Sequence, residues 1–559
     1  MIPLRLAREL TYQLDQAHEH ERLAKALACV PVFLVLWKGE GESDILALWQ
    51  HLAAEGHEPE KYYPASLDAL RMKNLNVLPN ALQKIATIFE VRGNWDVRKA
   101  LLTEFLDWAE AQKDEKRMMR AHRSIGSLLY QRGDQEHAMM HLSESLRIAE
   151  SLGDKRGMSR CIGHMGNIHL NLGRYAEAAE CYERQRVICE ALGDKHGMAR
   201  AIGGMGLVHH APGRNTEAAE CFERQRAVCE ALGDKRGMSG AIGNMGLIHR
   251  NQGRYAEATD CYERQRAICE ALGDKHGISK ASSNLGLVHK DESRYAEATE
   301  CFEQAREISE ALGDKSTMSY AIGNMGLVHH LQGRYSEAAE QLEQQRDLCE
   351  AVGNKSGRSI AIGNMGSLLL DLGALEDAMR KFQEALEGHR EIGFRYGMTY
   401  WHDGIAKTLL AMTKRSEADV RSTSLQDARK NAEDCIRISE EIGKPDTIFL
   451  GRVTLARIDA AEGNVALATE KLEAMLAEAT DEEQIADLHY WLWKITTSQP
   501  PPISLRSQEG EHKTEALARY ISLYSRIPKF QFVKRITELK GERVPTSAED
   551  LEERAHDRD

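Results

Sequence analysis

Apolar and polar positions along this chain repeat with a period of forty residues. In the stretch 241–280, Ile242, Met245 and His249 share one helical face and the pattern runs to Asn251. Gly253 then interrupts it, and a second helical pattern continues to Gly273. Each unit therefore predicts a helical hairpin. The units open near Ala81, Ala121, Cys161, Ala201, Ala241, Ala281, Ala321 and Ala361.

Glycine and aspartate mark the junctions between units. Gly273 is typical of a left-handed residue that ends a helix, and Asp274 is typical of the residue that caps the next one. The connections are therefore short, and a repeat of 20 to 50 residues built this way indicates a stacked array. We expect an all-α fold, an α-solenoid of stacked helical hairpins.

The segments before and after the regular repeats differ from them in sequence. Residues 1–80 predict an N-terminal helical capping module, in which Leu6, Leu10 and Leu14 share one apolar helical face. Residues 81–400 hold eight regular units, and 401–484 hold two degenerate ones, the first with an insertion of about eight residues around 413–424. Residues 485–540 predict C-terminal capping helices, with 500–502 a proline break, and 541–559 a disordered tail.

Composition narrows the possible partners. The chain has 559 residues, 42% of them hydrophobic and 6% aromatic, and its net charge is −13. This balance argues against nucleic acid and against an anionic membrane, since both favour basic surfaces. Most of the eleven cysteines lie at recurring positions within the predicted helices. No secretory leader and no apolar run long enough to span a membrane is recognisable. We expect a reduced, cytoplasmic protein.

The repeat resembles the tetratricopeptide repeat. The spacing from Gly246 to Gly253, together with Tyr255, Ala258 and Tyr262, matches the small, turn and aromatic positions of that family. The forty-residue unit is longer than the thirty-four-residue form and is similar to the repeats of the Pins/LGN group and kinesin light chain. The chain departs from the family pattern at His249, where tyrosine is usual, and at Gln265, where alanine is usual. The resemblance implies a right-handed α-solenoid, a superhelix whose concave groove binds proteins.

Residues 5–55 carry a second resemblance. Their helical segments, which end in PheLeuValLeuTrp and AspIleLeuAlaLeuTrp, are similar to the region that follows the NTPase in NACHT-type signalling proteins of the nephrocystin-3-like kind. No NTPase precedes Met1, which is where the chain departs from that family. The resemblance therefore implies an NTPase or effector that acts in cis in a longer gene product or in trans from a neighbouring chain.

Geometry identifies the stripe of the first helices that faces the groove. With Ile242, Met245 and His249 toward the core, the opposite stripe holds residues spaced by four, three and four. Its members in four successive units are Gly240, Asn244, Leu247 and Asn251; Lys280, Asn284, Leu287 and Asp291; Tyr320, Asn324, Leu327 and Leu331; and Ile360, Asn364, Ser367 and Asp371.

Asparagine recurs at the second place of this stripe. Asn244, Asn284, Asn324 and Asn364 would form a ladder of amides able to grip the backbone of an extended peptide, flanked by Leu247, Leu287 and Leu327. Asn251, Lys280 and Tyr320 complete the expected peptide-binding set. The ladder is absent upstream, at Ser124, His164 and Gly204, so we place the site in the second half of the array. The alternative is that these asparagines recur through duplication and only face solvent.

Two other recurring positions favour structural roles. Gly243, Gly323 and Gly363, with Ser283 as the exception, lie one turn before a second glycine, and close helix packing explains them better than a hinge. The second is a histidine that recurs once in each of five neighbouring hairpins, which we call the histidine ladder. Neighbouring helices pack about 8–10 Å apart, which is too far for two of these histidines to bind one metal ion. The histidine ladder indicates satisfied core histidines and no metal site. Its members are His169, His209, His249, His289 and His329.

No catalytic signature is recognisable, and we expect neither an enzyme nor a cofactor. GlyAspLysSer at 313–316 lacks the first glycine of a phosphate loop and falls at a helix-to-helix turn. The leading hypothesis is therefore a protein–protein interaction scaffold that binds a peptide in its concave groove. The alternative is the ligand-sensing arm of a NACHT-like signalling NTPase. Trp and Tyr residues near 490 can cover the core or pair two copies, so the oligomeric state stays open.

Overall fold

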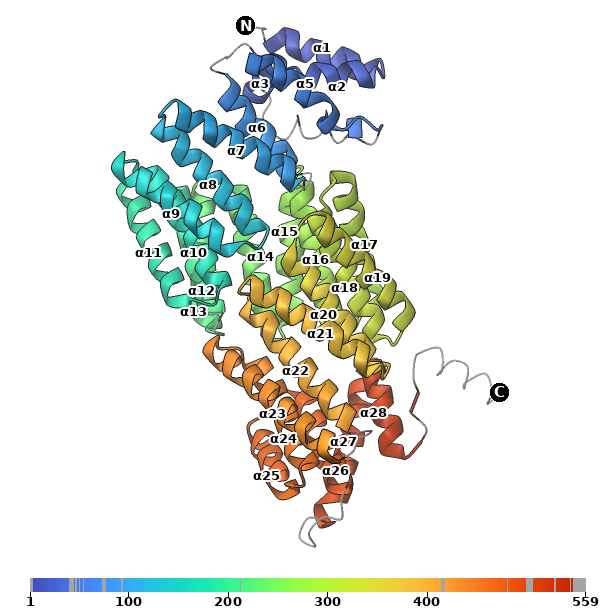
Figure 1. The fold of residues 1–559 in the computed structure, drawn as a ribbon. Coiled ribbons are helices and arrows are strands. Elements are labelled where there is room, and N and C mark those ends of the chain that lie inside the picture. Colours follow the sequence, from blue (N-terminus) through green and yellow to red (C-terminus); the bar gives the residue numbers. More distant parts are fainter. Residues whose placement is uncertain are drawn as a thin grey trace. The chain divides into compact units, whose positions relative to one another are not determined.

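A computed structural model describes residues 4–39, 45, 48–49, 51–53, 55–72, 77–91, 94–211, 213–413, 418–479, 481–498, 506–526, 529–542 and 544–545. Every regular element in these residues is a helix, as Figure 1 shows. The predicted all-α solenoid of stacked hairpins is confirmed. The chain divides into one unit of residues 1–164 and 307–318 and a second unit of 165–306 and 319–559.

Ten consecutive hairpins form the array. In each, an A helix is followed by a B helix, and each B helix packs on the A helix that follows it where both lie wholly within one of the two units. The pairs are α6 (Leu78–Val91) with α7 (Trp95–Ala111), α8 (Glu115–Gln131) with α9 (Gln135–Ser151), α10 (Lys155–Asn171) with α11 (Tyr175–Ala191), α12 (Lys195–His210) with α13 (Asn215–Ala231), α14 (Lys235–Asn251) with α15 (Tyr255–Ala271), α16 (Lys275–Asp291) with α17 (Tyr295–Leu312), α18 (Lys315–Leu331) with α19 (Tyr335–Ala351), α20 (Lys355–Asp371) with α21 (Leu375–Glu391), α22 (Arg395–Met412) with α23 (Ala418–Glu441), and α24 (Pro445–Ala461) with α25 (Val465–Glu478).

Capping residues set where each A helix begins. Gly273 has φ +64°, and Asp274 Oδ1 accepts a hydrogen bond from the Gly277 backbone N–H at 2.9 Å. The predicted glycine–aspartate junction is therefore confirmed. The same cap at Asp234 starts α14 at Lys235, so the predicted unit start near Ala241 lies inside this helix, after a polar first turn. The segment 313–316 is likewise a turn, with Asp314 accepting from the Thr317 N–H at 3.0 Å.

Glycines inside the A helices allow close packing, as predicted. A Cβ on Gly246 would lie 2.8 Å from Cε1 of Tyr262, so the aromatic ring of the B helix rests directly on the A-helix backbone. Gly206 faces Phe222 and Gly286 faces Phe302 in the same way. Since these contacts recur in successive hairpins, they fix the distance between the two helices of each unit.

The histidine ladder differs from expectation. Its five members are half-buried, and Nδ1 of each is buried with no hydrogen-bond partner among the described residues. Burial lowers the pKa of four of them, His169, His209, His249 and His329, which favours neutral rings. They therefore pack as neutral side chains but are not fully satisfied. Among the described residues, no three His, Cys, Asp or Glu side chains gather closely enough to hold an ion.

The N-terminal helices form a module inside the first unit. α1 (Leu4–Gln16), α2 (His20–Ala28), α3 (Val30–Gly39) and α5 (Pro59–Met72) enclose Phe33, Trp49 and Tyr63, and Trp49 Nε1 donates to the Tyr63 hydroxyl at 3.0 Å. The predicted leucine face of α1 is wrong: Leu6 and Leu10 are 60% and 42% exposed. The buried face instead carries Ala7, Thr11 and Leu14, since a small residue lets α1 approach its neighbours closely.

The second unit contains contacts between hairpins that are distant in sequence. The Tyr175 hydroxyl at the start of α11 donates to the Ile442 carbonyl at the end of α23, at 3.3 Å. A Cβ on Gly393 would also lie 2.9 Å from Cδ2 of Leu172. These contacts link the first hairpin of this unit to the turns that flank α22 and α23, so its helices complete a turn of the solenoid.

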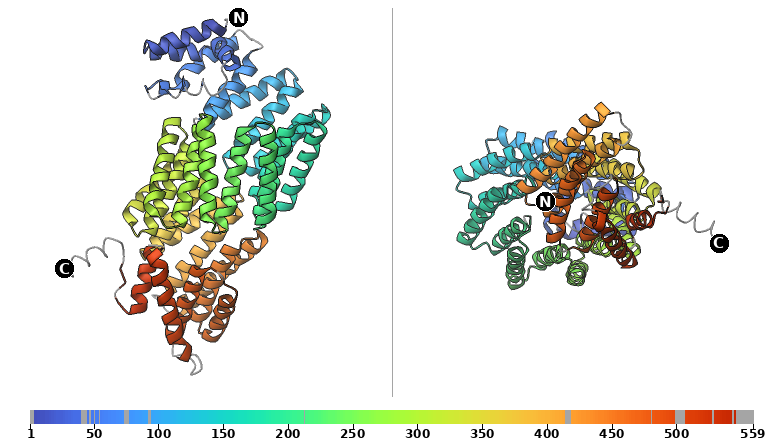
Figure 2. Two further views of the ribbon diagram at one scale, coloured as in Figure 1. Left: turned by 180° about the vertical axis from the view of Figure 1, so that it is seen from behind. Right: turned by 90° about the horizontal axis from the view of Figure 1, so that it is seen from below.

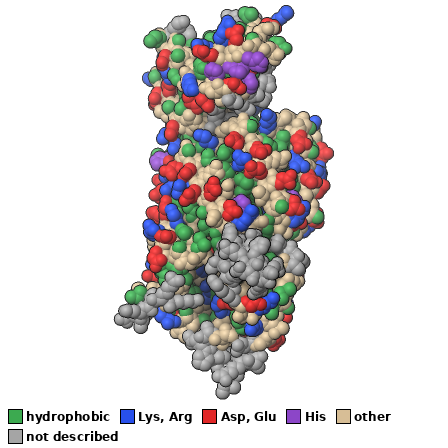
Figure 3. All heavy atoms as spheres, turned by 90° about the vertical axis from the view of Figure 1, so that its right-hand side faces the viewer, with side chains coloured by type: hydrophobic (Ala, Val, Ile, Leu, Met, Phe, Trp, Pro, Cys, Tyr) green, Lys and Arg blue, Asp and Glu red, His purple; other side chains and the backbone are tan. Residues whose placement is uncertain are grey.

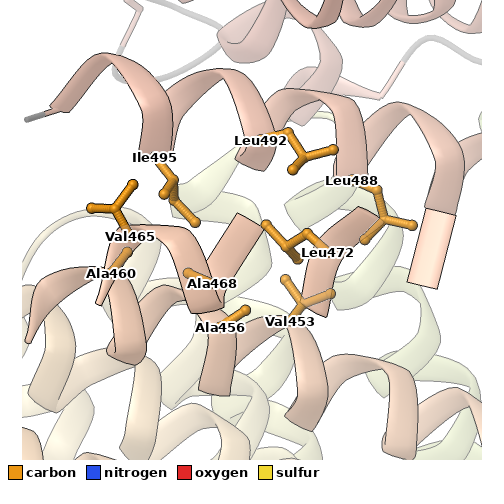
Figure 4. Packing of buried hydrophobic residues seen from close by; sticks show 9 residues of the cluster. All are labelled: Val453, Ala456, Ala460, Val465, Ala468, Leu472, Leu488, Leu492 and Ile495. Carbon is orange, nitrogen blue, oxygen red and sulfur yellow. The ribbon is translucent and has the colours of Figure 1, made fainter. Parts of the chain in front are cut away.

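Three helices follow the last hairpin: α26 (Glu482–Ser498), α27 (Arg506–Arg526) and α28 (Phe530–Lys540). Leu488, Leu492 and Ile495 of α26 cover the apolar residues of α24 and α25, as Figure 4 shows. The insertion predicted around 413–424 is helical from Ala418 onward, within α23, and residues 414–417 lie outside the described part. The prolines at 500–502 and the tail from 546 also lie outside it.

The exposed surface mixes both signs of charge. On the face drawn in Figure 3, acidic and basic side chains alternate, and histidines gather over the N-terminal helices. The B helices carry many local pairs, such as Arg186 with Glu183 at 2.7 Å. Such exposed pairs contribute only about 0.3–0.5 kcal/mol each, so they act chiefly in solvation. Among the described residues, no helix is both long and apolar enough to cross a bilayer.

Candidate functional site

The predicted stripe lies on the A helices of the second unit with graded exposure. Asn244, Asn284 and Asn364 are half-buried, as are Leu247 and Leu327. Leu287 is buried, and Asn324 is only 7% exposed. Asn251 and Lys280 are exposed, and Tyr320 is 46% exposed. Asn251, Lys280 and Tyr320, which lie at the ends of the stripe on their helices, therefore face solvent. The asparagines and leucines between these ends are partly or fully covered.

Several polar groups of the stripe are already engaged with the array itself. Asn324 Nδ2 donates to the carbonyl of Tyr320 at 2.9 Å, on its own helix. Asn251 Nδ2 lies 3.2 Å from Nε2 of His210 on the preceding A helix. Asp291 accepts from Arg250 Nε at 2.6 Å in the equivalent place. The last turns of successive A helices are thus tied to one another by polar contacts.

A pocket of about 500 Å3 opens where the stripe reaches α18, α20, α22 and α24. It contains Leu327 and Asn364 from the predicted set; the other predicted residues do not line it. Its apolar wall is formed by Leu327, Ile360, Leu370, Phe382, Phe394, Trp401 and Leu450, and its more polar side by Asn364, Ser367, Asp371, Tyr396, Tyr400, Asp403 and Lys407, with Gly397 and Gly404 completing the lining. The size and mixed character are typical of sites that bind a small ligand or an anchoring side chain.

Trp401 forms one wall of the pocket and is held in place from behind. Its Nε1 donates to Nδ1 of His389 at 2.8 Å, and Gly363 leaves room for its ring, because a Cβ there would lie 2.3 Å from Trp401 Cη2. His389 is fully buried, and this burial lowers its pKa to about 4. The imidazole is therefore neutral at neutral pH and can accept the indole N–H.

Two tyrosines at the mouth of the pocket share one acceptor. The hydroxyls of Tyr396 and Tyr400 lie 3.0 and 3.1 Å from Oδ2 of Asp446 and 2.8 Å from each other. Burial raises the pKa of Tyr396 to about 12 and also raises that of Tyr400. Both phenols therefore stay protonated, and their rings offer flat apolar surfaces to a ligand.

The charged lining residues are paired within the chain. Asp403 is buried and receives hydrogen bonds from Thr454 Oγ1 and Lys407 Nζ, both at 2.6 Å. Asp371 accepts from His330 Nε2 at 2.9 Å. Carboxylates engaged in this way are poor general bases, since their acceptor sites are already used. The pocket is consequently equipped for binding through apolar contact and hydrogen bonds.

The aromatic part of the pocket was missed because the predicted stripe stopped at Asp371. Adding one further period of forty to Ile360 and Ser367 gives Tyr400 and Lys407, which both line the pocket. The signal was therefore present in the sequence. It was obscured because the unit from residue 401 is irregular and carries the insertion in its B helix.

Comparison with known families agrees with this architecture. The family profile of the tetratricopeptide repeat matches residues 160–231, 238–311 and 317–391. The chain contains tetratricopeptide repeats. The profile of anaphase-promoting complex subunit 5 matches residues 92–174, which includes tetratricopeptide-like hairpins of the first unit. No curated protein matches the chain.

Several solved structures match the chain at low sequence identity. BtubC (BKLC) from P. vanneervenii is 16% identical, with 39% of this chain and 91% of that one covered and a TM-score of 0.33. A signal transduction ATPase with a tetratricopeptide repeat sensor from Pyrococcus horikoshii is 14% identical, with 63% and 55% covered and a TM-score of 0.42. A Rap protein complexed with competence and sporulation factor is 15% identical, with 62% and 98% covered and a TM-score of 0.43.

Proposed function

We propose that this tetratricopeptide array is a non-catalytic interaction scaffold that binds a peptide segment of a partner protein along its A helices. The observation that carries the proposal is the pocket between α18 and α24. It joins Leu327 and Asn364 of the predicted stripe to the rings of Tyr396, Tyr400 and Trp401. An apolar side chain of the partner would enter this pocket as its anchor.

The polar residues of the stripe supply the second part of binding. Asn364 lies at the pocket, and Asn284 and Asn244 follow on the preceding A helices, half-buried and on the same helical face. Amides can donate and accept at once, so they suit the backbone of an extended segment whatever its side chains. Asn324 contributes less, because its amide N–H already donates to Tyr320.

A display screen of random peptides against the intact chain tests this proposal. Asn284→Ala combined with Asn364→Ala should weaken recovered peptides roughly tenfold, as expected when hydrogen bonds to a bound backbone are lost. Asn171→Ala, an exposed asparagine on the upstream helix α10, is the matched control and should leave affinity unchanged. If the double variant and the control bind every peptide like the wild type, the ladder does not bind peptide.

The second candidate function is the ligand-sensing arm of a signalling NTPase. It is favoured by the resemblance of residues 5–55, whose helices form a module with a core of its own around Trp49 and Tyr63. Purification of the tagged chain from its natural source distinguishes the two. An NTPase recovered in stoichiometric amount, and lost when the module is deleted, would favour the sensing arm.

A further inference from the structure

Trp491 of α26 is flanked by two arginines from different helices. The Arg457 guanidinium carbon, on α24, lies 3.9 Å from the centre of the indole ring. The Arg535 guanidinium carbon, on α28, lies 4.9 Å from the same ring and 3.7 Å from the ring of Tyr490. Three helices of the second unit therefore bring two positive charges to one aromatic side chain.

These two guanidiniums lack direct counter-ions. Neither has a carboxylate oxygen within 4.0 Å among the described residues. Nε of each is buried and has no hydrogen-bond partner in the same part of the chain. Burial and the charge of Arg535 lower the pKa of Arg457 to about 10. Despite its own burial, Arg535 has a raised pKa, because Tyr490, Asp487 and Tyr520 favour its charged form. The two charges therefore repel each other in a half-buried place.

The carboxylates nearby are already engaged with other donors. Asp487 accepts the hydroxyl of Tyr520. Glu538 receives Lys494 Nζ at 2.7 Å and also accepts the Tyr490 hydroxyl. Asp403, the remaining carboxylate close to Arg457, holds Lys407 and Thr454. Glu538 and Asp403 are each paired with a lysine, whereas the hydroxyl on Asp487 is neutral. Asp487 therefore offsets only one of the two arginines, and the pair keeps a net positive charge.

We propose that Arg457 and Arg535 form an oxyanion-binding site beside Trp491 and that the bound anion holds α28 against α24 and α26. A phosphate or a carboxylate has the planar or tetrahedral oxygens that match the guanidinium fork. Aromatic stacking fixes the guanidinium planes, so little side-chain freedom is lost when the anion binds.

Anion binding would reach beyond the site through α28. The same helix extends to α19, where Lys534 Nζ donates to the Tyr335 hydroxyl at 3.0 Å, and Val533 packs beside Tyr335 and Leu368. Loss of the anion is expected to loosen these contacts as well as those with α26. The site does not depend on peptide binding in the pocket, so either proposal can fail alone.

Hydrogen–deuterium exchange of the full chain tests the site, with the α28 peptide as readout. Inorganic phosphate is titrated at constant ionic strength set with chloride, and N-acetylglutamate serves as the carboxylate probe. In the wild type, one or both should slow exchange in α28 in a saturable way. Arg457→Gln should shift the midpoint roughly tenfold or more, as expected for the loss of a charge-assisted contact.

Two further variants make the outcome specific. Arg452→Gln removes an exposed arginine five residues earlier on the same helix and should respond like the wild type. Arg457→Lys keeps the charge without the fork and should fall between wild type and Arg457→Gln. A response to phosphate alone would mean that the ligand carries a phosphate group. A response to both probes would mean that an acidic side chain of a protein can also be the ligand. The proposal is overturned if neither probe acts, or if Arg457→Gln responds like the wild type.

Discussion

Gly243 and Gln265 occupy one shared space between the two helices of a hairpin. A Cβ on Gly243 would lie 2.6 Å from Nε2 of Gln265, and the pairs Gly203 with Gln225 and Gly323 with Gln345 repeat the arrangement. Where serine replaces the glycine, at Ser283, the residue at the glutamine position is Ala305. In this unit a larger residue thus replaces the glycine and a smaller residue replaces the glutamine.

Gly243→Ala is expected to lose most of the roughly 1 kcal/mol that alanine gains by helix propensity, since its methyl group must displace the buried end of the Gln265 side chain. Adding Gln265→Ala should recover most of that loss, because the pair then approximates Ser283 with Ala305. Chemical denaturation of the single and double variants measures the coupling.

Gly240→Ala is the control for this pair. Gly240 lies on the same helix with no atom near its would-be Cβ, so alanine there should stabilise by up to about 1 kcal/mol through helix propensity alone. Equal effects of the two glycine substitutions would mean that packing against Gln265 does not explain Gly243.

Asp234 predicts a pH-dependent contribution from helix capping. Its Oδ1 accepts from the Gly237 N–H at 2.9 Å, and this bond lowers its pKa below the ordinary 3.8. A lowered carboxyl pKa adds stability above 3.8 that disappears as the pH falls through the folded value. Asp234→Ala should cost about 1 kcal/mol at neutral pH. The cost should shrink in acid, measured by denaturation across the range; a pH-independent cost would contradict the capping role.

His389 predicts acid sensitivity in the same direction as Asp234, but in a higher pH window. Burial lowers its pKa from 6.5 to about 4, so the folded state binds fewer protons than the unfolded state between these values. Stability from this residue is therefore full above pH 6.5 and falls as the pH decreases toward 4. His389→Gln should make the stability depend less on pH between 6.5 and 4. Thermal unfolding of both proteins at a series of pH values measures this.

The fold could be predicted because its signals repeat. Gly273, Asp274 and the glycines facing Tyr262 and its equivalents recur at a fixed period, and each has a local physical reason that needs no tertiary information. The apolar pattern that marks each unit begins later than its A helix because Lys235 and Arg236 are polar, whereas the cap at Asp234 marks the helix start itself. Leu6 and Leu10 were misjudged because Ala7, a small residue, decides which face of α1 is buried.

The candidate site was less accessible to sequence reasoning. The spacing rule placed Leu327 and Asn364 on a shared face, and both line the pocket. Tyr396, Phe394 and Trp401 belong to an irregular hairpin, and their approach to Asn364 depends on how α20 packs against α22. The hydrogen bond from Asn324 to its own helix could not be predicted from the sequence either. Whether an asparagine side chain bonds to water or to the backbone depends on how far it is exposed in the fold.

The most direct test is a calorimetric titration of a peptide recovered by display into three forms of the chain. Leu327→Lys places a charge at the pocket, whereas Leu207→Lys makes the same change at the equivalent place of the upstream hairpin, where Gly204 replaces the asparagine. We predict that Leu327→Lys weakens binding about thirtyfold or more, as at an interface anchor, while Leu207→Lys stays within roughly twofold of wild type. Unchanged affinity in Leu327→Lys, with its fold intact, would contradict the account.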